Sequence, residues 1–164
     1  MPSAVLVGRE APDFSLPGDS GKEVTLRDLR ERSVVLFFYP LSWTEAAEAE
    51  LRSLAEVSGD LEDLECEVLV ISVDSSPCQR AYKTHLGVDL QLLSDFQREV
   101  SGLYGVLNEE TGYSQAATFV VDREGLVRYQ LVNDGCLIRD SEELLHIVRE
   151  LERNRRRGRR EIKT

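Results

Sequence analysis

Two short segments hold the residues whose types and spacing could do chemistry. In the first, an apolar run ends at Pro40, and Thr44 follows at the start of a predicted helix. A nucleophilic thiol on the first turn of such a helix would be held as a thiolate, because the helix N-terminus favours negative charge. The residue there is Ala47, which has no lone pair to donate to a substrate.

The second segment carries the best-placed thiol of the chain. Ser76 and Pro77 predict a helix start, with Ser76 as its cap, so Cys78 falls in the first turn, where the pKa of a thiol is lowered. Cys78 also shares a predicted helix face with Tyr82 and Leu86, which favours a half-buried packing thiol. Cys78 is therefore a candidate redox thiol with a competing structural interpretation.

The other thiols and the imidazoles give little sign of a site. Cys66 directly precedes a predicted buried strand, and Cys136 follows a glycine in a loop without a basic neighbour. Three cysteines without a CxxC pair support neither a disulfide framework nor a zinc cluster. His85 and His146 lack acidic or thiol partners in the sequence, and we assign neither a catalytic role. We expect no metal ion or other cofactor.

Alternating strands and helices must position these segments. An N-terminal hairpin is predicted first, and the continuous apolar runs at 34–39 and 68–73 are typical of strands buried on both faces. Ser42 is expected to cap the helix between them, with Glu45 completing a capping box and Trp43 on its apolar face. The remaining predicted elements are a short strand at 90–93, a short helix at 96–104, a hairpin of 118–121 with 126–131, and a helix at 141–153.

This order of elements predicts an α/β protein with a thioredoxin-like fold. Right-handed crossovers make the two buried strands parallel neighbours, with helices on the faces of a central mixed sheet and the hairpin added at the N-terminus. A length of 164 residues and a hydrophobic content of 41% suit one globular domain, which we expect over residues 1–152. No apolar stretch approaches the roughly 20 residues that span a membrane, and no secretion signal is recognisable, so we expect a cytoplasmic protein.

The charge of the chain is unevenly distributed. The net charge is −10, but residues 153–164 form a basic C-terminal tail of +6, which leaves −16 on the remainder. The acidic body would repel nucleic acid, whereas the tail could contact an acidic protein surface or a nucleic acid. A frayed, solvated helix end is the simpler interpretation of the tail.

Six segments, in register and in order, resemble the peroxiredoxins, the alkyl hydroperoxide reductase and thiol-specific antioxidant family, and especially their one-cysteine, alkyl hydroperoxide reductase E-like branch. Together they cover most of residues 8–150, which makes the resemblance in fold specific. The segments are 8–14, 34–40, 71–74, 92–95, 104–106 and 118–122.

The resemblance implies a site that this chain fills only in part. The family pattern is Pro-x-x-x-Thr-x-x-Cys, with an arginine just before a Thr/Ser-Phe-x-x-Asp strand. Pro40 and Thr44 match the pattern, and Glu50 matches a carboxylate often seen three residues past the cysteine. The cysteine position is Ala47, and the arginine position aligns with Ala116. These residues would then form a vestigial peroxidatic pocket without the two groups that create and use a thiolate.

We therefore expect a family member that is inactive as a thiol peroxidase and that acts by binding or assembly. One alternative is a hydroperoxide reductase, with an antioxidant role, that uses a relocated nucleophile at Cys78. Another is an engineered Cys-to-Ala form of an active peroxiredoxin, which would explain Ala47 but not the missing arginine. The resemblance also implies a homodimer, because the family commonly dimerises near its active-site loops.

Overall fold

A mixed five-stranded sheet forms the centre of the molecule, in the order β5-β4-β3-β8-β9. The structure is a computed structural model that describes residues 5–133 and 138–162. Strands β5, β4 and β3 run parallel, and β8 and β9 continue the sheet in antiparallel fashion. The strands of the sheet are β3 (Ser33–Phe38), β4 (Cys66–Ser72), β5 (Gln91–Ser94), β8 (Ala116–Val121) and β9 (Val127–Asn133).

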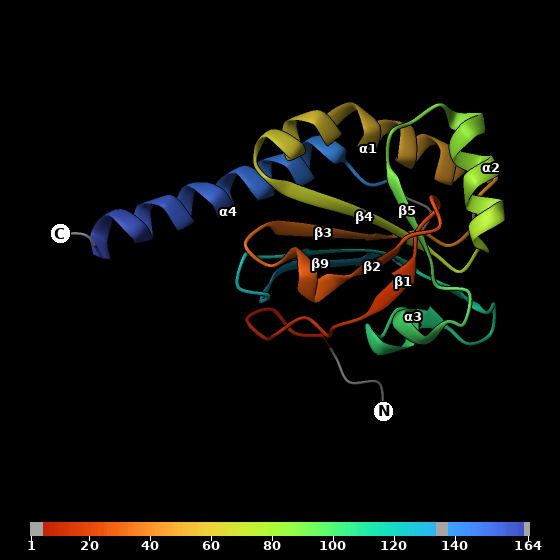
Figure 1. The fold of residues 1–164 in the computed structure, drawn as a ribbon, viewed down its shortest axis with the longest axis horizontal. Helices are drawn as coiled ribbons and strands as arrows, with labels where there is room; N and C mark the ends of the chain where they lie inside the picture. Colours follow the sequence, from red (N-terminus) through yellow and green to blue (C-terminus); the bar gives the residue numbers. More distant parts are fainter. Residues whose placement is uncertain (1–4, 134–137, 163–164) are drawn as a thin grey trace.

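Helices and a hairpin cover the two faces of this sheet (Figure 1). The helices are α1 (Glu45–Asp63), α2 (Ser76–Leu86), α3 (Glu99–Leu103) and α4 (Ser141–Ile162). Helices α1, α2 and α4 pack on one face, and α3 lies on the other face with the hairpin of β1 (Ser15–Pro17) and β2 (Glu23–Thr25). Smaller elements are a 3-10 turn at Leu26–Leu29 and the short strands β6 (Leu107–Asn108) and β7 (Tyr113–Ser114).

The apolar run of β3 is buried along its whole length because it supplies both cores. Alternate side chains point to opposite faces of a strand. Val34, Leu36 and Phe38 join the core under the hairpin and α3, and Phe37 and the adjoining Tyr39 join the core under α1, α2 and α4. The prediction of a thioredoxin-like α/β fold with buried parallel strands and an N-terminal hairpin is confirmed.

The predicted helix starts are wrong in detail. Helix α1 begins at Glu45 with Thr44 as its N-cap, so Ser42 neither caps the helix nor forms a capping box. The Ser42 hydroxyl lies 2.9 Å from the hydroxyl of Tyr39 instead. In α2 the cap is Ser75, whose side chain accepts the backbone N–H of Cys78, rather than Ser76. In both cases a neighbouring hydroxyl residue competed for the same role.

Helix α4 is longer than predicted. It continues through the basic segment to Ile162, and its distal part projects beyond the body of the molecule (Figure 1). Within the described residues, no helix combines the length and the apolar character that crossing a bilayer requires.

Candidate functional site

The first turn of α1 is organised by the side chain of Thr44. The Thr44 Oγ1 atom accepts the backbone N–H of Ala47 at 3.1 Å and donates to the carbonyl of Leu41 at 3.3 Å. An N-cap of this kind satisfies a backbone donor that the helix itself leaves unpaired. Ala47 lies in this first turn and is 2% exposed. The methyl group of Ala47 is thus part of the core beneath the helix start.

A hydrogen-bonded loop holds the approach to this turn. The backbone N–H of Ser42 donates to Asp74 Oδ2 at 2.9 Å, which ties the loop to the end of β4. Trp43 adopts a left-handed backbone conformation with φ of 68°, which is uncommon for a non-glycine residue. Its ring lies 5.0 Å from those of Tyr82 and His85 on α2, and its side chain is 53% exposed. Trp43 therefore packs toward α2, and the prediction that it lies on the apolar face of α1 is wrong.

The sheet register brings Ala116 to the same end of the molecule as the loop of residues 40–44 between β3 and α1. Strand β8 pairs antiparallel with β3, so that Ala117 lies opposite Phe38 at the end of β3. Ala116, the first residue of β8, is half-buried, and Pro40 is half-buried in the bend that follows β3. The Ser114 hydroxyl donates to the carbonyl of Tyr39 at 3.3 Å, and this hydrogen bond joins the segment before β8 to the end of β3.

A buried ion pair lies one helical turn beyond Ala47. Arg139 Nε donates to Glu50 Oε2 at 2.5 Å, and its Nη2 donates to Oε1 at 3.1 Å. The backbone N–H of Arg139 also donates to Glu50 Oε2. Both side chains are 5% exposed. Burial lowers the pKa of Arg139, although Glu50 opposes this effect. A fork of this geometry is the strong form of a carboxylate–guanidinium contact.

The same guanidinium joins α1 to the central sheet. Its Nη1 donates to the carbonyl of Ala117 and to Thr118 Oγ1, at 2.9 and 3.1 Å, and its Cζ lies 3.5 Å from the centre of the Phe37 ring. The role of Arg139 was not predicted from the sequence. One signal for a cationic partner was present, because Glu50 lies beside the buried Ala47 and Leu51 on α1, and a buried carboxylate needs such a partner.

The two described thiols lie in unfavourable surroundings for a thiolate. Burial raises the pKa of Cys66 to about 12, aided by nearby Glu152. Burial also raises the pKa of Cys78, followed in effect by the Asp74 carboxylate, whose Oδ1 lies 3.9 Å from the Cys78 sulfur. Cys78 is half-buried, beside the fully buried Tyr82, in agreement with its packing interpretation. Cys136 falls outside the described residues.

The charges around the first turn of α1 are negative. Glu45 and Glu48 lie in this turn, and Arg52 pairs with Glu48 at 3.0 Å. A carboxylate near a thiol disfavours ionisation of that thiol. Among the described residues, no group of three His, Cys, Asp or Glu side chains is arranged to hold a metal ion.

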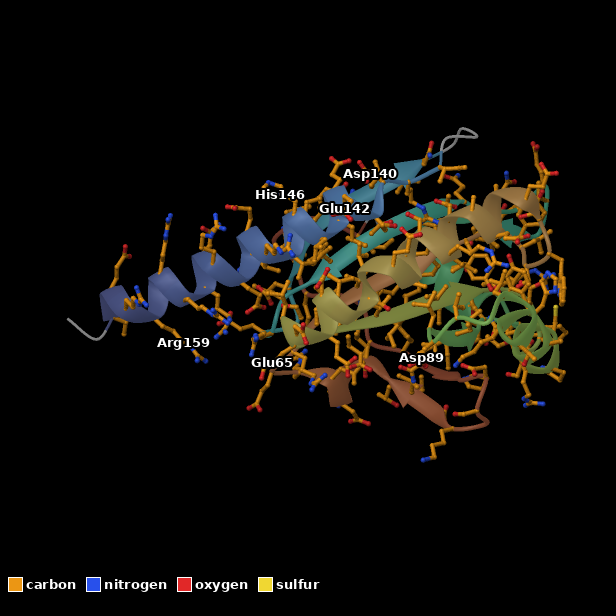
Figure 2. All side chains as sticks on the ribbon, turned by 90° about the horizontal axis from the view of Figure 1, so that it is seen from above. Glu65, Asp89, Asp140, Glu142, His146 and Arg159 are labelled. Atoms are coloured by element: carbon orange, nitrogen blue, oxygen red, sulfur yellow. The ribbon has the colours of Figure 1, made fainter. Side chains whose placement is uncertain are left out.

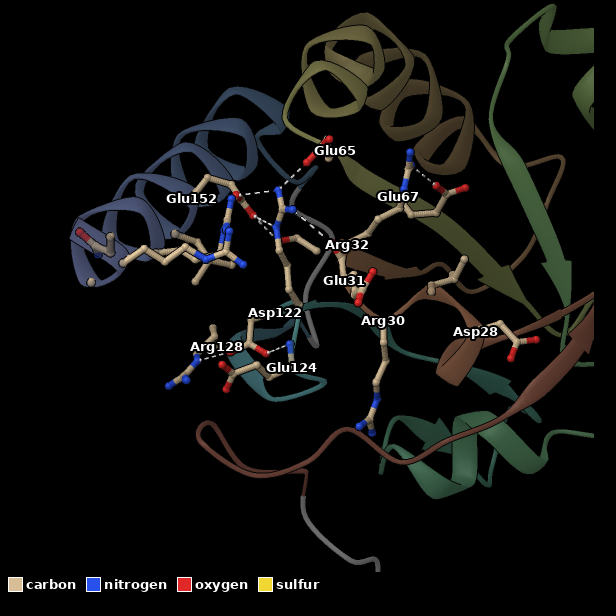
Figure 3. Close-up of a pocket in the computed structure, with 18 of the residues that line it drawn as sticks. Asp28, Arg30, Glu31, Arg32, Glu65, Glu67, Asp122, Glu124, Arg128 and Glu152 are labelled. Carbon is tan, nitrogen blue, oxygen red and sulfur yellow. Dashed lines mark hydrogen bonds and ion pairs between the residues drawn. The ribbon is translucent and has the colours of Figure 1, made fainter. Parts of the chain in front are cut away.

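A concave region lies at the opposite end of β3, away from Ala47. It is a groove of about 1220 Å³ between the body and the distal part of α4, and its walls carry acidic and basic side chains in comparable number (Figure 3). Glu152 is buried at its base and accepts hydrogen bonds from Ser33 Oγ at 2.6 Å, from Arg123 Nη2 at 2.9 Å and from Arg155 Nε at 3.0 Å. These contacts hold α4 against the body of the molecule, and they provide the Glu152 carboxylate with hydrogen-bond donors from the protein itself.

The fold and the helix start described above define a class, the thioredoxin-like α/β proteins with an N-terminal hairpin. The model of the AhpC/TSA family matches residues 7–130, and the chain belongs to this family. Alkyl hydroperoxide reductase E of Mycobacterium tuberculosis is 38% identical over 137 residues, which cover 82% of this chain and 90% of the relative. Peroxiredoxin-2 of Bos taurus is 36% identical over 152 residues, covering 87% and 76%.

Solved structures agree with this membership. The reduced 2-Cys peroxiredoxin of Plasmodium vivax superimposes with a TM-score of 0.86 at 29% identity, covering 93% of this chain and 84% of that one. AhpC of Enterococcus faecalis superimposes with a TM-score of 0.87 at 26% identity, covering 93% and 96%. The family resemblance expected from the sequence is confirmed.

Proposed function

We propose that this protein is a peroxiredoxin-family member that does not reduce peroxides and that acts by binding or assembly. The observation that carries the proposal is Ala47, a buried methyl group on the capped first turn of α1. Thiol peroxidases work by attack of a thiolate on a peroxide oxygen, which forms a sulfenic acid and releases water or an alcohol. A methyl group cannot take this step.

The position aligned with the family arginine supports the same conclusion. Ala116 is half-buried at the start of β8 and offers no donor from its side chain. Arg139 is committed to Glu50 and to the backbone of Ala117. In this proposal Pro40, Thr44, Ala47 and Ala116 form a vestigial peroxidatic pocket, in which Thr44 serves as a helix cap.

A second candidate function is peroxide reduction by Cys78. It is favoured by one observation, that Trp43, the residue before the N-cap of α1, packs its ring on Tyr82 and His85 of α2, the helix that also carries Cys78. The names of the relatives, alkyl hydroperoxide reductase E and peroxiredoxin-2, point to the same chemistry. Against it, burial and Asp74 both raise the pKa of Cys78, which lowers the thiolate fraction at neutral pH.

We further propose a homodimer in the cytoplasm. The dimer follows from the family resemblance, and the free Cys66 and Cys78 fit a reducing compartment. Sedimentation of the purified protein tests the dimer, and fractionation of the source cells tests the compartment.

The proposal of inactivity is tested by comparing the chain with a variant in which Cys66, Cys78 and Cys136 are all replaced by serine. Both proteins are given hydrogen peroxide and an alkyl hydroperoxide with a thiol reductant. Equal, background rates support the proposal. Faster turnover by the unmodified protein contradicts it, and sulfenic acid at Cys78 alone, detected by mass spectrometry, then supports the second candidate.

A further inference from the structure

The distal part of α4 carries arginines that find few acidic partners among the residues that the structure describes. A groove of about 320 Å³ runs along one side of this helix, bounded by Leu64, Glu152 and five arginines, namely Arg149, Arg153, Arg156, Arg157 and Arg160. Arg153 pairs with Glu150 of the same helix at 2.7 Å. Among the described residues, neither Arg156 nor Arg160 takes part in an ion pair. We call Arg153, Arg156 and Arg160 the arginine stripe.

The direction of this projecting helix is fixed at its base. Buried Glu152 is bonded to Ser33 of β3, to Arg123 of the β8–β9 turn and to Arg155 of its own helix (Figure 3). Beyond this point α4 extends away from the sheet, with Arg159 near its distal end (Figure 2). The arginine stripe is therefore presented on a held helix, not on a frayed tail.

Helix α1 carries the opposite charge with a matching spacing. Glu56, Asp60 and Asp63 are exposed and follow one another at steps of four and three residues, which places them on one face of the helix. No side-chain hydrogen bond or ion pair within the described chain occupies them. Gly59 is exposed on the same face, and a Cβ there would meet nothing within 4 Å, so another helix can approach closely. We call these three acids the acidic stripe.

We propose that the arginine stripe of α4 binds the acidic stripe of α1 in a second copy of this chain. Along α4 the arginines follow one another at steps of three and four residues, the reverse of the order along α1. Two helices that run antiparallel therefore bring Arg153 toward Asp63, Arg156 toward Asp60 and Arg160 toward Glu56. Because each copy has both stripes, a two-fold arrangement makes the contact twice.

The charge of the rest of the molecule favours a second copy over a nucleic acid. Outside residues 153–164 the chain carries −16, and part of this negative charge is the acidic stripe of α1. A nucleic acid could pair only with the arginine stripe, whereas a second copy pairs with both stripes of each chain. The inference rests on the assembly part of the proposed function and does not depend on whether the protein reduces peroxides.

Charge reversal tests the contact by sedimentation velocity. One variant carries Arg153→Glu, Arg156→Glu and Arg160→Glu, and the other carries Glu56→Arg, Asp60→Arg and Asp63→Arg. Self-association of the unmodified protein should weaken by about tenfold or more between about 0.05 M and about 0.5 M salt, since exposed charges are screened. Each variant alone should lose this salt-sensitive association, and an equimolar mixture of the two should regain it.

A matched control separates the stripes from net charge. Glu99→Arg, Glu109→Arg and Glu110→Arg change the net charge as much as the α1 variant does, but alter exposed acids outside α1. This control should associate like the unmodified protein, and circular dichroism checks that α4 remains helical in every variant.

Two results overturn the proposal: self-association of the unmodified protein that does not weaken with salt, and an equimolar mixture of the two stripe variants that does not regain association. Loss in the α4 variant alone, with tight binding of a labelled single-stranded oligonucleotide by the unmodified protein, identifies a nucleic-acid partner and also overturns it. Peroxide turnover is assayed separately, so a failure of assembly is distinguishable from a failure of the inactivity proposal.

Discussion

Arg139 and Glu50 lie 89 residues apart in the sequence and form a buried, forked ion pair directly beyond the first turn of α1. The pair joins the segment before α4 to α1, and Arg139 also bonds to Thr118 of β8. It therefore determines how the first turn of α1 sits on the sheet.

Removing one partner of this pair should destabilise the protein strongly. Glu50→Ala leaves a buried guanidinium without its carboxylate, and we expect the free energy of unfolding to fall by about 3–5 kcal/mol. The double replacement Glu50→Ala with Arg139→Ala should lose clearly less than the sum of the losses of the single variants Glu50→Ala and Arg139→Ala. Urea denaturation of the four proteins measures this coupling, and additive losses would show that the two side chains act independently.

The cap of α1 should contribute a smaller amount. Thr44→Ala removes the acceptor for the backbone N–H of Ala47, and we expect a loss of about 1 kcal/mol in the free energy of unfolding. Thr44→Ser keeps the hydroxyl and serves as the matched control. Equal stability of the alanine and serine variants would mean that the hydroxyl does not stabilise the helix.

The reactivity of Cys78 should depend on Asp74. In a variant with Cys66→Ser and Cys136→Ser, the alkylation rate of Cys78 should reach half its maximum at a pH above the ordinary thiol pKa of 9.0, because burial and then Asp74 raise its pKa. Asp74→Asn should shift this midpoint to lower pH. A midpoint below 9.0, or one that does not respond to Asp74→Asn, would contradict the assigned surroundings of Cys78.

The Glu152 contacts should make the stability sensitive to acid. Burial alone would raise the pKa of Glu152, but hydrogen bonds from Ser33, Arg123 and Arg155 lower it overall. A carboxyl group with a lower pKa in the folded state contributes stability above its unfolded pKa and loses it as the pH falls through the folded value. We therefore expect Glu152→Gln to be less stable than the unmodified protein at pH 7 and to lose less stability below the ordinary carboxyl pKa of 4.5. Thermal unfolding against pH checks this, and parallel curves for the two proteins would refute it.

The fold was predictable from the sequence because the strongest pattern lies where the sheet is buried on both faces. The apolar run from Val34 to Tyr39 supplies both cores, and a short continuous apolar run is typical of a strand that is buried on both faces. Helix boundaries were less predictable, because Ser42, Thr44, Ser75 and Ser76 all carry hydroxyls that can cap a helix. Which of them caps depends on the tertiary contacts of the loop, such as the bond from Ser42 to Asp74.

The site was predictable only where its residues are close in sequence. Thr44 and Ala47 fall within one helical turn, so their relation could be read from spacing. Arg139 could not be found in this way, because its partner Glu50 lies on another element and is reached only when α1 and α4 pack on the same face of the sheet. The length of α4 was also missed, because its distal turns, from Arg153 onward, are mostly basic and do not continue the apolar stripe of Leu144, Leu145 and Val148.

The central claim is that the α1 site lacks a thiol and a guanidinium, and restoring both tests it most directly. We compare peroxide consumption by four proteins in which Cys66, Cys78 and Cys136 are all replaced by serine: the chain with no other change, Ala47→Cys, Ala116→Arg, and the double variant. The unmodified chain, with its three cysteines, is assayed beside them. The account predicts background rates for the first and third proteins, weak turnover for Ala47→Cys, and turnover at least about tenfold faster for the double variant, in line with the usual contribution of a charged group that stabilises a thiolate and the reacting oxygens. Turnover by the unmodified, cysteine-containing chain that matches the double variant would contradict the account.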